Sequence, residues 1–260
     1  MATPVKGQAL EKVVLITGAS RGIGAATALL AAAQGYAVAV NYAANSLAAD
    51  EVVRAIRAGG GNAITVQADV SVEADVVAMF KKVDAKLGRL TALVNNAGVV
   101  DQTCRVDAMS LERLQRMFAI NVFGSFICAR EAVKRMSTNY GGAGGKGGSI
   151  VNVSSAAARL GAPGQYVDYA AAKGAIDTFT LGLAKEVATE GIRVNAVRPG
   201  LIETEIHASG GLPNRVRDLV PSVPMQRAGT AQEVAQAIVW LLSDNSAYIT
   251  GTLLDVAGGR

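Results

Sequence analysis

Histidine and cysteine are scarce in this chain of 260 residues. His207 is the single histidine, which removes most routes to a histidine-based metal site or a Ser-His-Asp triad. Cys104 and Cys128 have no paired CxxC spacing, so neither a disulfide framework nor a zinc site is indicated. We therefore expect no bound metal, and the two thiols fit a reduced, cytoplasmic protein.

Long apolar runs and runs of like charge are absent too. No segment reaches the roughly 20 apolar residues of a membrane helix, and the N-terminal stretch lacks the pattern of a signal peptide. The 25 basic and 21 acidic residues are spread along the chain, with no basic run and no interleaved aromatic residues. We expect neither a membrane nor a nucleic-acid partner. With 50% hydrophobic and 18% charged residues, the chain has the composition of a folded protein.

Seven short runs of apolar or β-branched residues alternate with longer segments of helical period. The runs are continuous, as expected for a parallel sheet that is covered on both faces. We predict an α/β fold in which residues 1–260 form a single Rossmann-type doubly wound domain, with a seven-stranded parallel sheet flanked by helices. The predicted strands are residues 13–17, 37–41, 63–67, 91–95, 149–153, 192–197 and 253–256, and helices are predicted at 22–34, 72–87, 110–136 and 230–243. Thr230, three residues before Glu233, predicts a capping box on the last helix.

Two segments lack this periodicity. Residues 141–148 are mostly glycine and lack the Walker spacing, so they predict a flexible connection rather than a phosphate loop. Residues 203–225 carry two glycines and three prolines after a predicted strand end. This second segment is either a built-in substrate loop or an ordinary surface loop.

A glycine-rich turn follows the first predicted strand and opens a helix. Gly18, Gly22 and Gly24 are spaced G-x-x-x-G-x-G. A glycine there permits a tight turn and the close approach of a pyrophosphate, which the free N–H groups of the helix N-terminus can bind. The position of the turn favours a dinucleotide site over a turn without a ligand.

The end of the second predicted strand indicates which nicotinamide cofactor binds. It contains Asn41 and Tyr42 but no acidic residue that would bind a ribose 2′-hydroxyl and repel a 2′-phosphate. Arg21 lies in the glycine turn, where a guanidinium favours a phosphate beside the adenosine ribose. We therefore expect NADP(H) in preference to NAD(H).

A group of residues suited to proton transfer follows the fifth predicted strand. Tyrosine has an ordinary pKa near 10, and an ammonium group held close to it lowers that pKa. Residues four apart on a helix share one face, so Lys173 can serve Tyr169. Tyr166 lies seven residues from Lys173 and is a poorer candidate. Ser155 can donate a hydrogen bond to a substrate oxygen.

With these residues in view, the chain resembles the short-chain dehydrogenases/reductases nearly from end to end. The resemblance rests on residues 17–24, Asp69-Val70, Asn95-Asn96-Ala97-Gly98, Asn121, Ser155, Tyr169, Lys173 and Pro199-Gly200 with Ile202 and Thr204. It implies that Tyr169 is the general acid/base and that Ser155 positions the carbonyl oxygen. Lys173 would tune Tyr169 and hold the nicotinamide ribose, and Asn121 would place a water that connects Lys173 to solvent.

The resemblance also implies a set of cofactor contacts. Asp69 and Val70 would lie against the adenine, Asn95 on the adenosine side, and Ile202 and Thr204 near the carboxamide. The full set of predicted cofactor-binding residues is Gly18, Ser20, Arg21, Gly22, Ile23, Gly24, Asn41, Tyr42, Asp69, Val70, Asn95, Ala97, Gly98, Tyr169, Lys173, Pro199, Gly200, Ile202 and Thr204.

One spacing departs from the family pattern. Family members often have thirteen positions from the serine to the tyrosine, whereas Ser155 and Tyr169 are fourteen apart. Thirteen positions before Tyr169 is Ala156, which has no group to donate. We therefore assign the role to Ser155, with one extra residue near 165–168, and expect Ser154 to face the other side of the strand.

These residues predict an oxidoreductase that transfers a hydride between NADP(H) and a small-molecule carbonyl or alcohol substrate. Within that class, a 3-oxoacyl-[acyl-carrier-protein] reductase or a sugar (glucose-type) dehydrogenase is the alternative. An NADP(H)-binding sensor or scaffold is the alternative outside it, and the complete set of Ser155, Tyr169 and Lys173 argues against that. Docking of an acidic carrier protein would need a basic patch, for which Arg193, Arg198, Arg215, Arg217 and Arg227 are candidates.

Substrate choice and assembly depend on further segments. We expect the substrate pocket to be shaped by residues 104–109, 160–167 and 203–225. The resemblance implies a homotetramer that forms through the long central helices and the C-terminal strand, and residues 169–188 and 253–259 are compatible with it.

Overall fold

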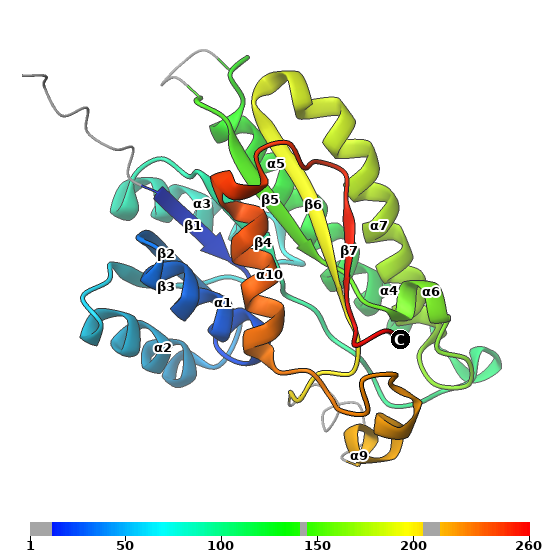
Figure 1. Ribbon diagram of the computed structural model, residues 1–260. Coiled ribbons are helices and arrows are strands. Elements are labelled where there is room, and N and C mark those ends of the chain that lie inside the picture. Colours follow the sequence, from blue (N-terminus) through cyan, green and yellow to red (C-terminus); the bar gives the residue numbers. More distant parts are fainter. Residues whose placement is uncertain (1–11, 141–144, 205–213) are drawn as a thin grey trace, which may run out of the picture.

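A single parallel sheet lies between two layers of helices (Figure 1) in the computed structural model, which describes residues 12–140, 145–204 and 214–260. Its strand order is β3-β2-β1-β4-β5-β6-β7. The strands are β1 (Lys12–Ile16), β2 (Tyr36–Tyr42), β3 (Ala63–Gln67), β4 (Ala92–Asn95), β5 (Gly148–Val153), β6 (Ile192–Pro199) and β7 (Leu253–Val256). The predicted seven-stranded parallel sheet is confirmed, with strand boundaries shifted by two residues at most.

The helices follow the strands in the alternating order that a doubly wound sheet requires. They are α1 (Gly22–Ala33), α2 (Ser46–Ala58), α3 (Glu73–Leu87), α4 (Leu111–Phe118), α5 (Gly124–Met136), α6 (Ala157–Leu160), α7 (Val167–Val187), α9 (Arg215–Leu219) and α10 (Ala231–Leu242). Short 3-10 turns are η1 (Val106–Ala108), η3 (Ala188–Glu190), η4 (Val220–Ser222) and η5 (Asp244–Ser246), and η2 (Ala119–Phe123) is a π-helical turn.

The continuous apolar runs of the strands are explained by burial on both faces. On β1, Val14 and Ile16 pack with α1, α2 and α10, whereas Val13 and Leu15 pack with α3, α5 and α7. Figure 1 shows the first group of helices on the near side of the sheet and the second group beyond it. Because successive side chains point to opposite faces, each strand supplies apolar residues to both cores.

Two helix predictions differ in outcome. The capping box on α10 is confirmed, since Glu233 N donates to Thr230 Oγ1 over 3.2 Å and Thr230 N donates to Glu233 Oε2 over 2.8 Å. The single helix predicted for residues 110–136 is wrong in its middle, where η2 separates α4 from α5. Asn121 lies in this π-helical turn, and its Nδ2 donates to Met117 O over 3.0 Å. A turn of this kind is frequent at functional sites.

The order of the strands in the sheet determines where a binding crevice forms. The chain runs outward from β1 to β2 and β3, then returns to the other side of β1 to form β4. At such a reversal the crossovers leave in opposite directions, which opens a crevice at the carboxyl ends of the strands. The glycine turn follows β1, residues 96–100 follow β4 and the Ser154-Ser155 pair follows β5. Three of the predicted motifs therefore converge at one edge of the sheet.

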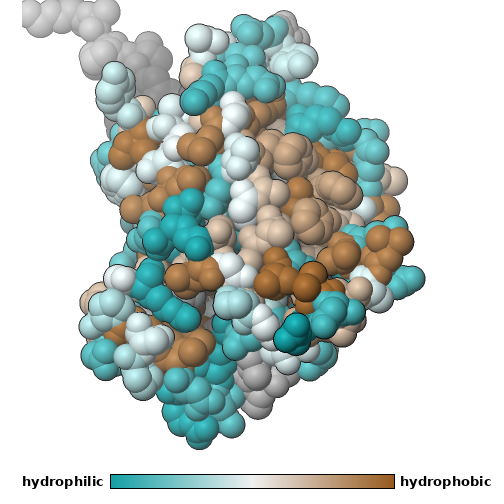
Figure 2. Space-filling view, turned by 90° about the vertical axis from the view of Figure 1, so that its right-hand side faces the viewer, coloured by the Kyte–Doolittle hydropathy of each residue, from teal (hydrophilic) through white to brown (hydrophobic). Residues whose placement is uncertain are grey.

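The helical face that carries α7 is partly apolar. Figure 2 views the molecule from the side on which α7 lies in Figure 1, and apolar side chains gather there among hydrophilic ones. Leu181, on α7, is 40% exposed. No helix within the described residues is both long and apolar enough to cross a membrane. His207, residues 141–144 of the predicted glycine connection and residues 205–213 of the predicted substrate loop lie outside the described residues.

Candidate active site

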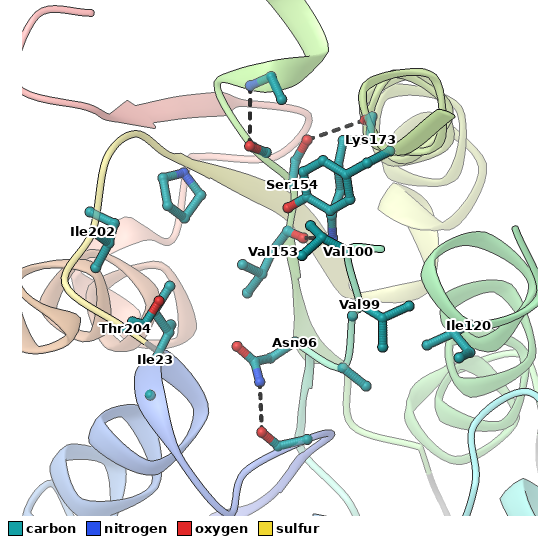
Figure 3. A pocket seen from close by; sticks show the side chains of 18 of the residues that line it. Ile23, Asn96, Val99, Val100, Ile120, Val153, Ser154, Lys173, Ile202 and Thr204 are labelled. Carbon is teal, nitrogen blue, oxygen red and sulfur yellow. Dashed lines mark hydrogen bonds between the residues drawn. The ribbon is translucent and has the colours of Figure 1, made fainter. Parts of the chain in front are cut away.

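A cavity of about 860 Å³ opens at the carboxyl ends of the strands. Figure 3 shows side chains that converge on it from the turn after β1, the loops after β4 and β5, helix α7 and the segment after β6. One end is lined by the glycine turn and the ends of β2 and β3. The other end is lined by Leu160, Ala162, Pro163, Gln165, Tyr166, Arg215, Leu219 and Arg260.

The glycine turn is shaped by backbone conformation and by close contacts. Gly18 and Gly22 have φ of +60° and +56°, a region that L side chains rarely adopt. A Cβ on Gly18 would lie 2.9 Å from the Cα of Ala97, and one on Gly24 would lie 2.6 Å from both Gly18 O and Asn96 Nδ2. Gly18 and Gly22 line the cavity, whereas Gly24 does not and serves the packing of the turn. The missing Cβ atoms of Gly18 and Gly24 thus let the turn pack closely against the loop after β4.

Asn96 joins the loop after β4 to this turn. Its Nδ2 donates to Thr17 O over 2.8 Å and to Gly18 O over 3.0 Å, and its backbone N donates to Thr17 Oγ1 over 2.9 Å (Figure 3). Asn95, which was predicted to contact the cofactor, does not line the cavity. Its Nδ2 donates instead to Asn152 Oδ1 and Ser125 O inside the fold. Adjacent residues at the end of a strand point to opposite sides. The side chain of Asn95 therefore lies inside the fold, whereas that of its neighbour Asn96 lies at the cavity.

Asn41 and Tyr42 occupy different environments at the end of β2. Asn41 is 1% exposed, and its Oδ1 accepts a hydrogen bond from Gly18 N over 3.0 Å. Its Nδ2 donates to Val66 O and Ala68 O over 3.2 and 3.1 Å. Tyr42 is half-buried and lines the cavity with Ala43, Ala44 and Asn45. Asn41 therefore fixes the glycine turn, and Tyr42 is the side chain that meets the open space.

The remaining residues predicted to bind the cofactor surround the same cavity. Ser20, Arg21, Ile23, Asp69, Val70, Ala97, Gly98, Pro199, Gly200, Ile202 and Thr204 all line it. Thr204 Cγ2 lies 3.6 Å from the Cβ position of Gly22, so the segment after β6 reaches the glycine turn. Asp69 Oδ1 accepts hydrogen bonds from Ser71 N and Oγ over 2.9 and 2.6 Å, which hold the loop after β3.

Ser155 and Tyr169 meet on the wall of the cavity. The Ser155 hydroxyl hydrogen-bonds to Tyr169, and both residues line the open space. Ser154 Oγ instead donates to Lys173 O over 3.2 Å, toward helix α7 (Figure 3). Of the two neighbouring serines, Ser155 is therefore the one placed beside the tyrosine. The helical turn at residues 157–160 and the left-handed Gly161 accommodate the fourteen-residue spacing.

Lys173 lies behind Tyr169, one turn along α7. Its Nζ is 5.6 Å from the centroid of the Tyr169 ring and donates to Val153 O over 2.7 Å. Asn121 is buried, and its Oδ1 accepts a hydrogen bond from Val99 N over 3.2 Å. A Cβ on Gly98 would lie 2.8 Å from Asn121 Oδ1 and 3.5 Å from Lys173 Nζ. Gly98 thus leaves the space in which these two polar groups approach each other, although Asn121 itself does not line the cavity.

Burial shifts the pKa values of Lys173 and Tyr169 in opposite directions. It lowers the pKa of Lys173 to about 8, and the charge of Asp177 opposes this shift. It raises the pKa of Tyr169, while the hydrogen bond from Ser155 and the charge of Arg215 lower it. Desolvation disfavours the charged form of each group. Burial therefore moves the two pKa values apart, with that of Lys173 near 8 and that of Tyr169 above its ordinary value of 10. Near neutral pH it favours the protonated phenol of Tyr169, the form that can give a proton to a substrate oxygen.

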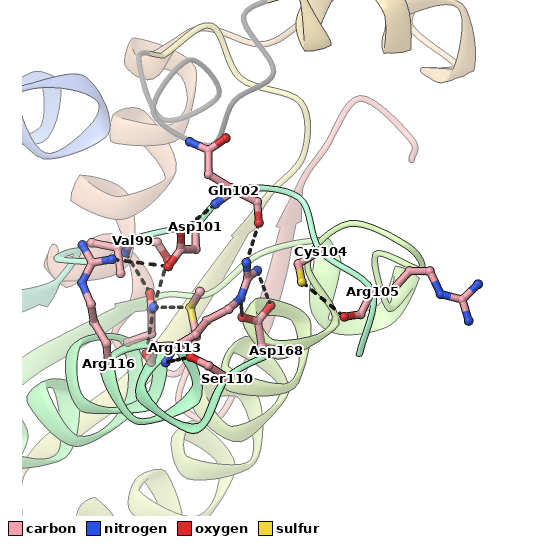
Figure 4. A network of polar contacts seen from close by, with 11 residues as sticks. Val99, Asp101, Gln102, Cys104, Arg105, Ser110, Arg113, Arg116 and Asp168 are labelled. Carbon is pink, nitrogen blue, oxygen red and sulfur yellow. Dashed lines mark hydrogen bonds and ion pairs between the residues drawn. The ribbon is translucent and has the colours of Figure 1, made fainter. Parts of the chain in front are cut away.

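A buried ion pair anchors the helix on which Tyr169 lies (Figure 4). Arg113 Nε donates to Asp168 Oδ2 over 2.8 Å, and the two side chains are 11% and 0% exposed. Arg113 Nη1 also donates to Gln102 O, in the loop after β4. One guanidinium thus ties that loop to the residue directly before Tyr169.

We expect Asp168→Asn to destabilise the protein by about 3 kcal/mol, because removing one partner of a buried pair leaves the other charge uncompensated. The melting temperature should fall by roughly 6–12 °C for a chain of this length. Asp107→Asn is the matched control, since the Arg105–Asp107 pair is exposed at both ends and an exposed pair contributes about 1 kcal/mol or less. The melting temperatures are measured by calorimetry. Equal values for the two variants would show that the Arg113–Asp168 pair does not anchor the helix.

The substrate end of the cavity corrects two expectations. Of the predicted segment 160–167, five residues line it, namely Leu160, Ala162, Pro163, Gln165 and Tyr166. None of residues 104–109 does; Cys104 N donates to Gln165 O and supports that wall from outside. The lining from the loop after β4 is formed by Val99 and Val100. Of the predicted segment 203–225, Thr204, Arg215 and Leu219 reach the cavity.

The five arginines considered for carrier docking do not form one patch. Arg193 donates to backbone carbonyls of residues 241–243, and Arg198 pairs with Asp177 over 2.8 Å. Arg217 pairs with Asp218, and Arg227 pairs with Glu233. Only Arg215 lines the cavity. Asn96 and Arg260 also line the cavity but were not among the predicted site residues. Asn96 lies in the motif Asn95-Asn96-Ala97-Gly98, which was a local signal, whereas Arg260 had none.

The chain is similar to known oxidoreductases over nearly its whole length. Residues 18–260 match the family model described as Enoyl-(Acyl carrier protein) reductase. The uncharacterized oxidoreductase YgfF of Escherichia coli (strain K12) is 58% identical, over 95% of this chain and 99% of that protein. A 3-oxoacyl-[acyl-carrier-protein] reductase of a Synechocystis strain is 42% identical, over 95% of this chain and 96% of that protein. A double mutant of a Serratia marcescens short-chain dehydrogenase/reductase superimposes with a TM-score of 0.87 at 32% identity, covering 95% of this chain and 97% of the other.

Proposed function

Because the chain belongs to the short-chain dehydrogenase/reductase family, we propose that it transfers a hydride between NADP(H) and a carbonyl or alcohol carbon, with Tyr169 as the proton donor or acceptor. The observation that carries this proposal is the meeting of Ser155, Tyr169 and Lys173 on one wall of a cavity that extends to the glycine turn. A bare nucleotide-binding module would need none of these three side chains.

The residues around the cavity fit a dinucleotide. Gly18 and Gly22 line the cavity, and α1 begins at Gly22 with no side chain capping its N-terminus. A pyrophosphate bound there would accept from the first N–H groups of α1. Asp69 and Val70 would hold the adenine end, and Ile202 and Thr204 the nicotinamide end. The cofactor supplies the hydride acceptor or donor when it is bound.

Ser155, Tyr169 and Lys173 have different roles in this proposal. Ser155 holds the oxygen by a hydrogen bond, and Tyr169 gives it a proton or takes one from it. Lys173 Nζ donates to Val153 O; in this proposal it stabilises the Tyr169 phenolate and would also hydrogen-bond the ribose of the bound cofactor. Asn121 stands close to Lys173 across the gap left by Gly98, where a water would return the proton from solvent.

NADP(H) is the preferred cofactor in this proposal. The open space beyond β2 is lined by Tyr42, Ala43, Ala44 and Asn45, none of which is acidic, and Arg21 lines the same end of the cavity. A 2′-phosphate would meet a cation there and no carboxylate.

We expect Tyr42→Asp to raise the dissociation constant of NADPH by about tenfold or more and to leave that of NADH within about threefold, because a carboxylate repels a 2′-phosphate and accepts from a 2′-hydroxyl. Asn41→Asp is a contrasting variant. Its second carboxylate oxygen would face the carbonyls of Val66 and Ala68, so this variant should lose stability and bind both cofactors poorly. Fluorescence titration of each cofactor measures both effects. A Tyr42→Asp protein that keeps its preference for NADPH would contradict the assigned position of the phosphate.

The substrate is a small carbonyl compound or its alcohol in this proposal, and a 3-oxoacyl thioester on a carrier protein is the second candidate. The second candidate is favoured by the relative at 42% identity that carries this name. A sugar dehydrogenase remains the third candidate. Oxidation of NADPH by a panel of ketones, aldehydes, 3-oxoacyl and 2-enoyl thioesters tests the proposal, followed by alcohols and glucose with NADP⁺. Cofactor binding without turnover on any of these compounds would favour the sensor or scaffold.

We further propose that the enzyme is a homotetramer in the cytoplasm. The partly apolar face at α7, where Leu181 is exposed, supports burial against another copy. Cys104 and Cys128 are both free thiols, as suits a reducing compartment. Light scattering on the purified chain tests the assembly: a monomeric mass at micromolar concentration would rule it out.

A further inference from the structure

Two guanidinium groups line the substrate end of the cavity. Arg215, at the start of α9, and Arg260 both line it. Burial lowers the pKa of Arg215, and the positive charge of Arg260 lowers it further, while only the hydroxyl groups of Tyr166 and Tyr169 act in the other direction. No carboxylate of the described residues contributes. Arg215 thus differs from Arg113 and Arg227, whose pKa values are raised by acidic partners.

Neutral groups surround Arg215 instead. Its Nη1 donates to Gln165 Oε1, and its Cζ lies 5.2 Å from the centroid of the Tyr166 ring. Within the part of the chain that the structure describes, Arg215 forms no ion pair, although it is half-buried. A guanidinium has five N–H donors, and burying its charge without an anion is unfavourable. An anion in the cavity would relieve this cost.

The position of Arg215 shows which anion it would meet. Its contacts are with Gln165 and Tyr166, in the segment that leads to Tyr169, and its charge lowers the pKa of Tyr169 itself. The phosphates of a dinucleotide would lie instead at the glycine turn, where the positive φ values of Gly18 and Gly22 make room for them. The anion beside Arg215 therefore belongs to the molecule whose oxygen reaches Tyr169.

We propose that the substrate is an oxo acid, whose carboxylate Arg215 binds while Arg260 adds to the positive field. The inference rests on the proposed function and names the substrate class for it. In the direction of reduction, the carbonyl carbon gains a hydride from NADPH and the oxygen gains a proton from Tyr169. The products are a hydroxy acid and NADP⁺.

Matched pairs of acids and esters test this inference. Steady-state reduction is measured with 2-, 3- and 4-oxopentanoate and with the methyl ester of each, in the wild type and in Arg215→Gln and Arg215→Lys. Arg217→Gln is the control, because Arg217 lies on the same short helix, is exposed and pairs with Asp218. We expect the wild type to prefer at least one acid to its ester.

For that acid, Arg215→Gln should raise KM by about 10- to 100-fold, the value of a charge-assisted hydrogen bond. KM for the ester should change by less than about threefold, Arg215→Lys should restore part of the loss, and Arg217→Gln should resemble the wild type. A role limited to tuning Tyr169 would instead shift the pH profile of kcat equally for acid and ester, and that result would overturn the inference.

Failure of this inference can be told from failure of the proposed function. If the esters are reduced in a Tyr169-dependent reaction and the acids are not preferred, the oxo-acid inference is wrong while the reductase stands. If no carbonyl compound is reduced although NADPH binds, the proposed function fails and the inference fails with it.

Discussion

Replacing Tyr169 by phenylalanine is expected to lower kcat by about 10³-fold, because the variant keeps the ring but loses the group that exchanges a proton with the substrate oxygen. Ser155 would still hold that oxygen, so KM should change little. Stopped-flow or steady-state oxidation of NADPH with the best carbonyl substrate measures the effect. The dissociation constant of NADPH should stay within about threefold of the wild-type value, since in the proposed site most of the cofactor would lie along the glycine turn and the ends of β2 and β3.

Tyr166→Phe is the matched control for this experiment. Tyr166 lines the same cavity, lies three residues earlier and packs its ring beneath Arg215, and its phenyl group would remain in place. We expect its kcat to fall by less than about tenfold, because a seven-residue separation places it away from Lys173. A larger loss of kcat for Tyr166→Phe than for Tyr169→Phe would show that Tyr166, not Tyr169, is the proton donor. Similar small losses in both variants would point to a proton donor outside this pair.

Lys173→Met is expected to lose activity without losing stability. Activity should fall by about 10²-fold or more, since the Tyr169 phenolate would lack its stabilising cation. Burial lowers the pKa of Lys173 from 10.5 to about 8, so keeping its proton at pH 7 costs the folded state about 3 kcal/mol. Leaving Val153 O without its donor costs about 1–3 kcal/mol in the variant. The balance predicts an unchanged or higher melting temperature at pH 7.

The pH dependence of stability gives a second measurement on the same variant. Between about pH 8 and pH 10.5 the unfolded wild type holds the Lys173 proton more than the folded state does, so its free energy of unfolding rises with pH in this window. Lys173→Met lacks this rise, and any advantage it has at pH 7 should shrink as the pH increases. Lys185→Met, an exposed lysine on the same helix, should behave like the wild type. A melting temperature that drops by several degrees at pH 7 in Lys173→Met would show that the buried charge is not costly.

Much of the fold and of the cofactor end could be predicted because each depends on local patterns. Buried parallel strands leave continuous apolar runs, and the strained backbone at Gly18 and Gly22 requires glycine. The π-helical turn around Asn121 could not be predicted, since its apolar residues keep a helical period through α4 and α5. The choice between Asn95 and Asn96 depends on strand register, which neighbouring strands determine and which the local sequence does not show.

The substrate end was the least predictable part for a related reason. Arg215 and Arg260 are 45 positions apart, and each follows a different strand, so their proximity is a product of the sheet order alone. Arg215 was one of five arginines that looked alike in the sequence. What distinguishes it is its place on the cavity wall without an ion pair among the described residues. Arg193 is held by backbone carbonyls away from the cavity, and Arg198, Arg217 and Arg227 each have an acidic partner.

The bonds between Thr17, Gly18 and Asn96 have a consequence for how such an enzyme can diversify. They join the turn after β1 to the loop after β4 through part-buried atoms at the strand ends, so hydrogen bonds within the protein hold the proposed cofactor half together. The other half of the cavity comes from residues 160–166 and 214–219, which are loops and short helical turns. Substitutions there can accumulate without disturbing the nucleotide cradle. Substrate specificity can thus change by substitution at this end with little loss of folding stability, which makes it the property of this molecule that evolves most readily.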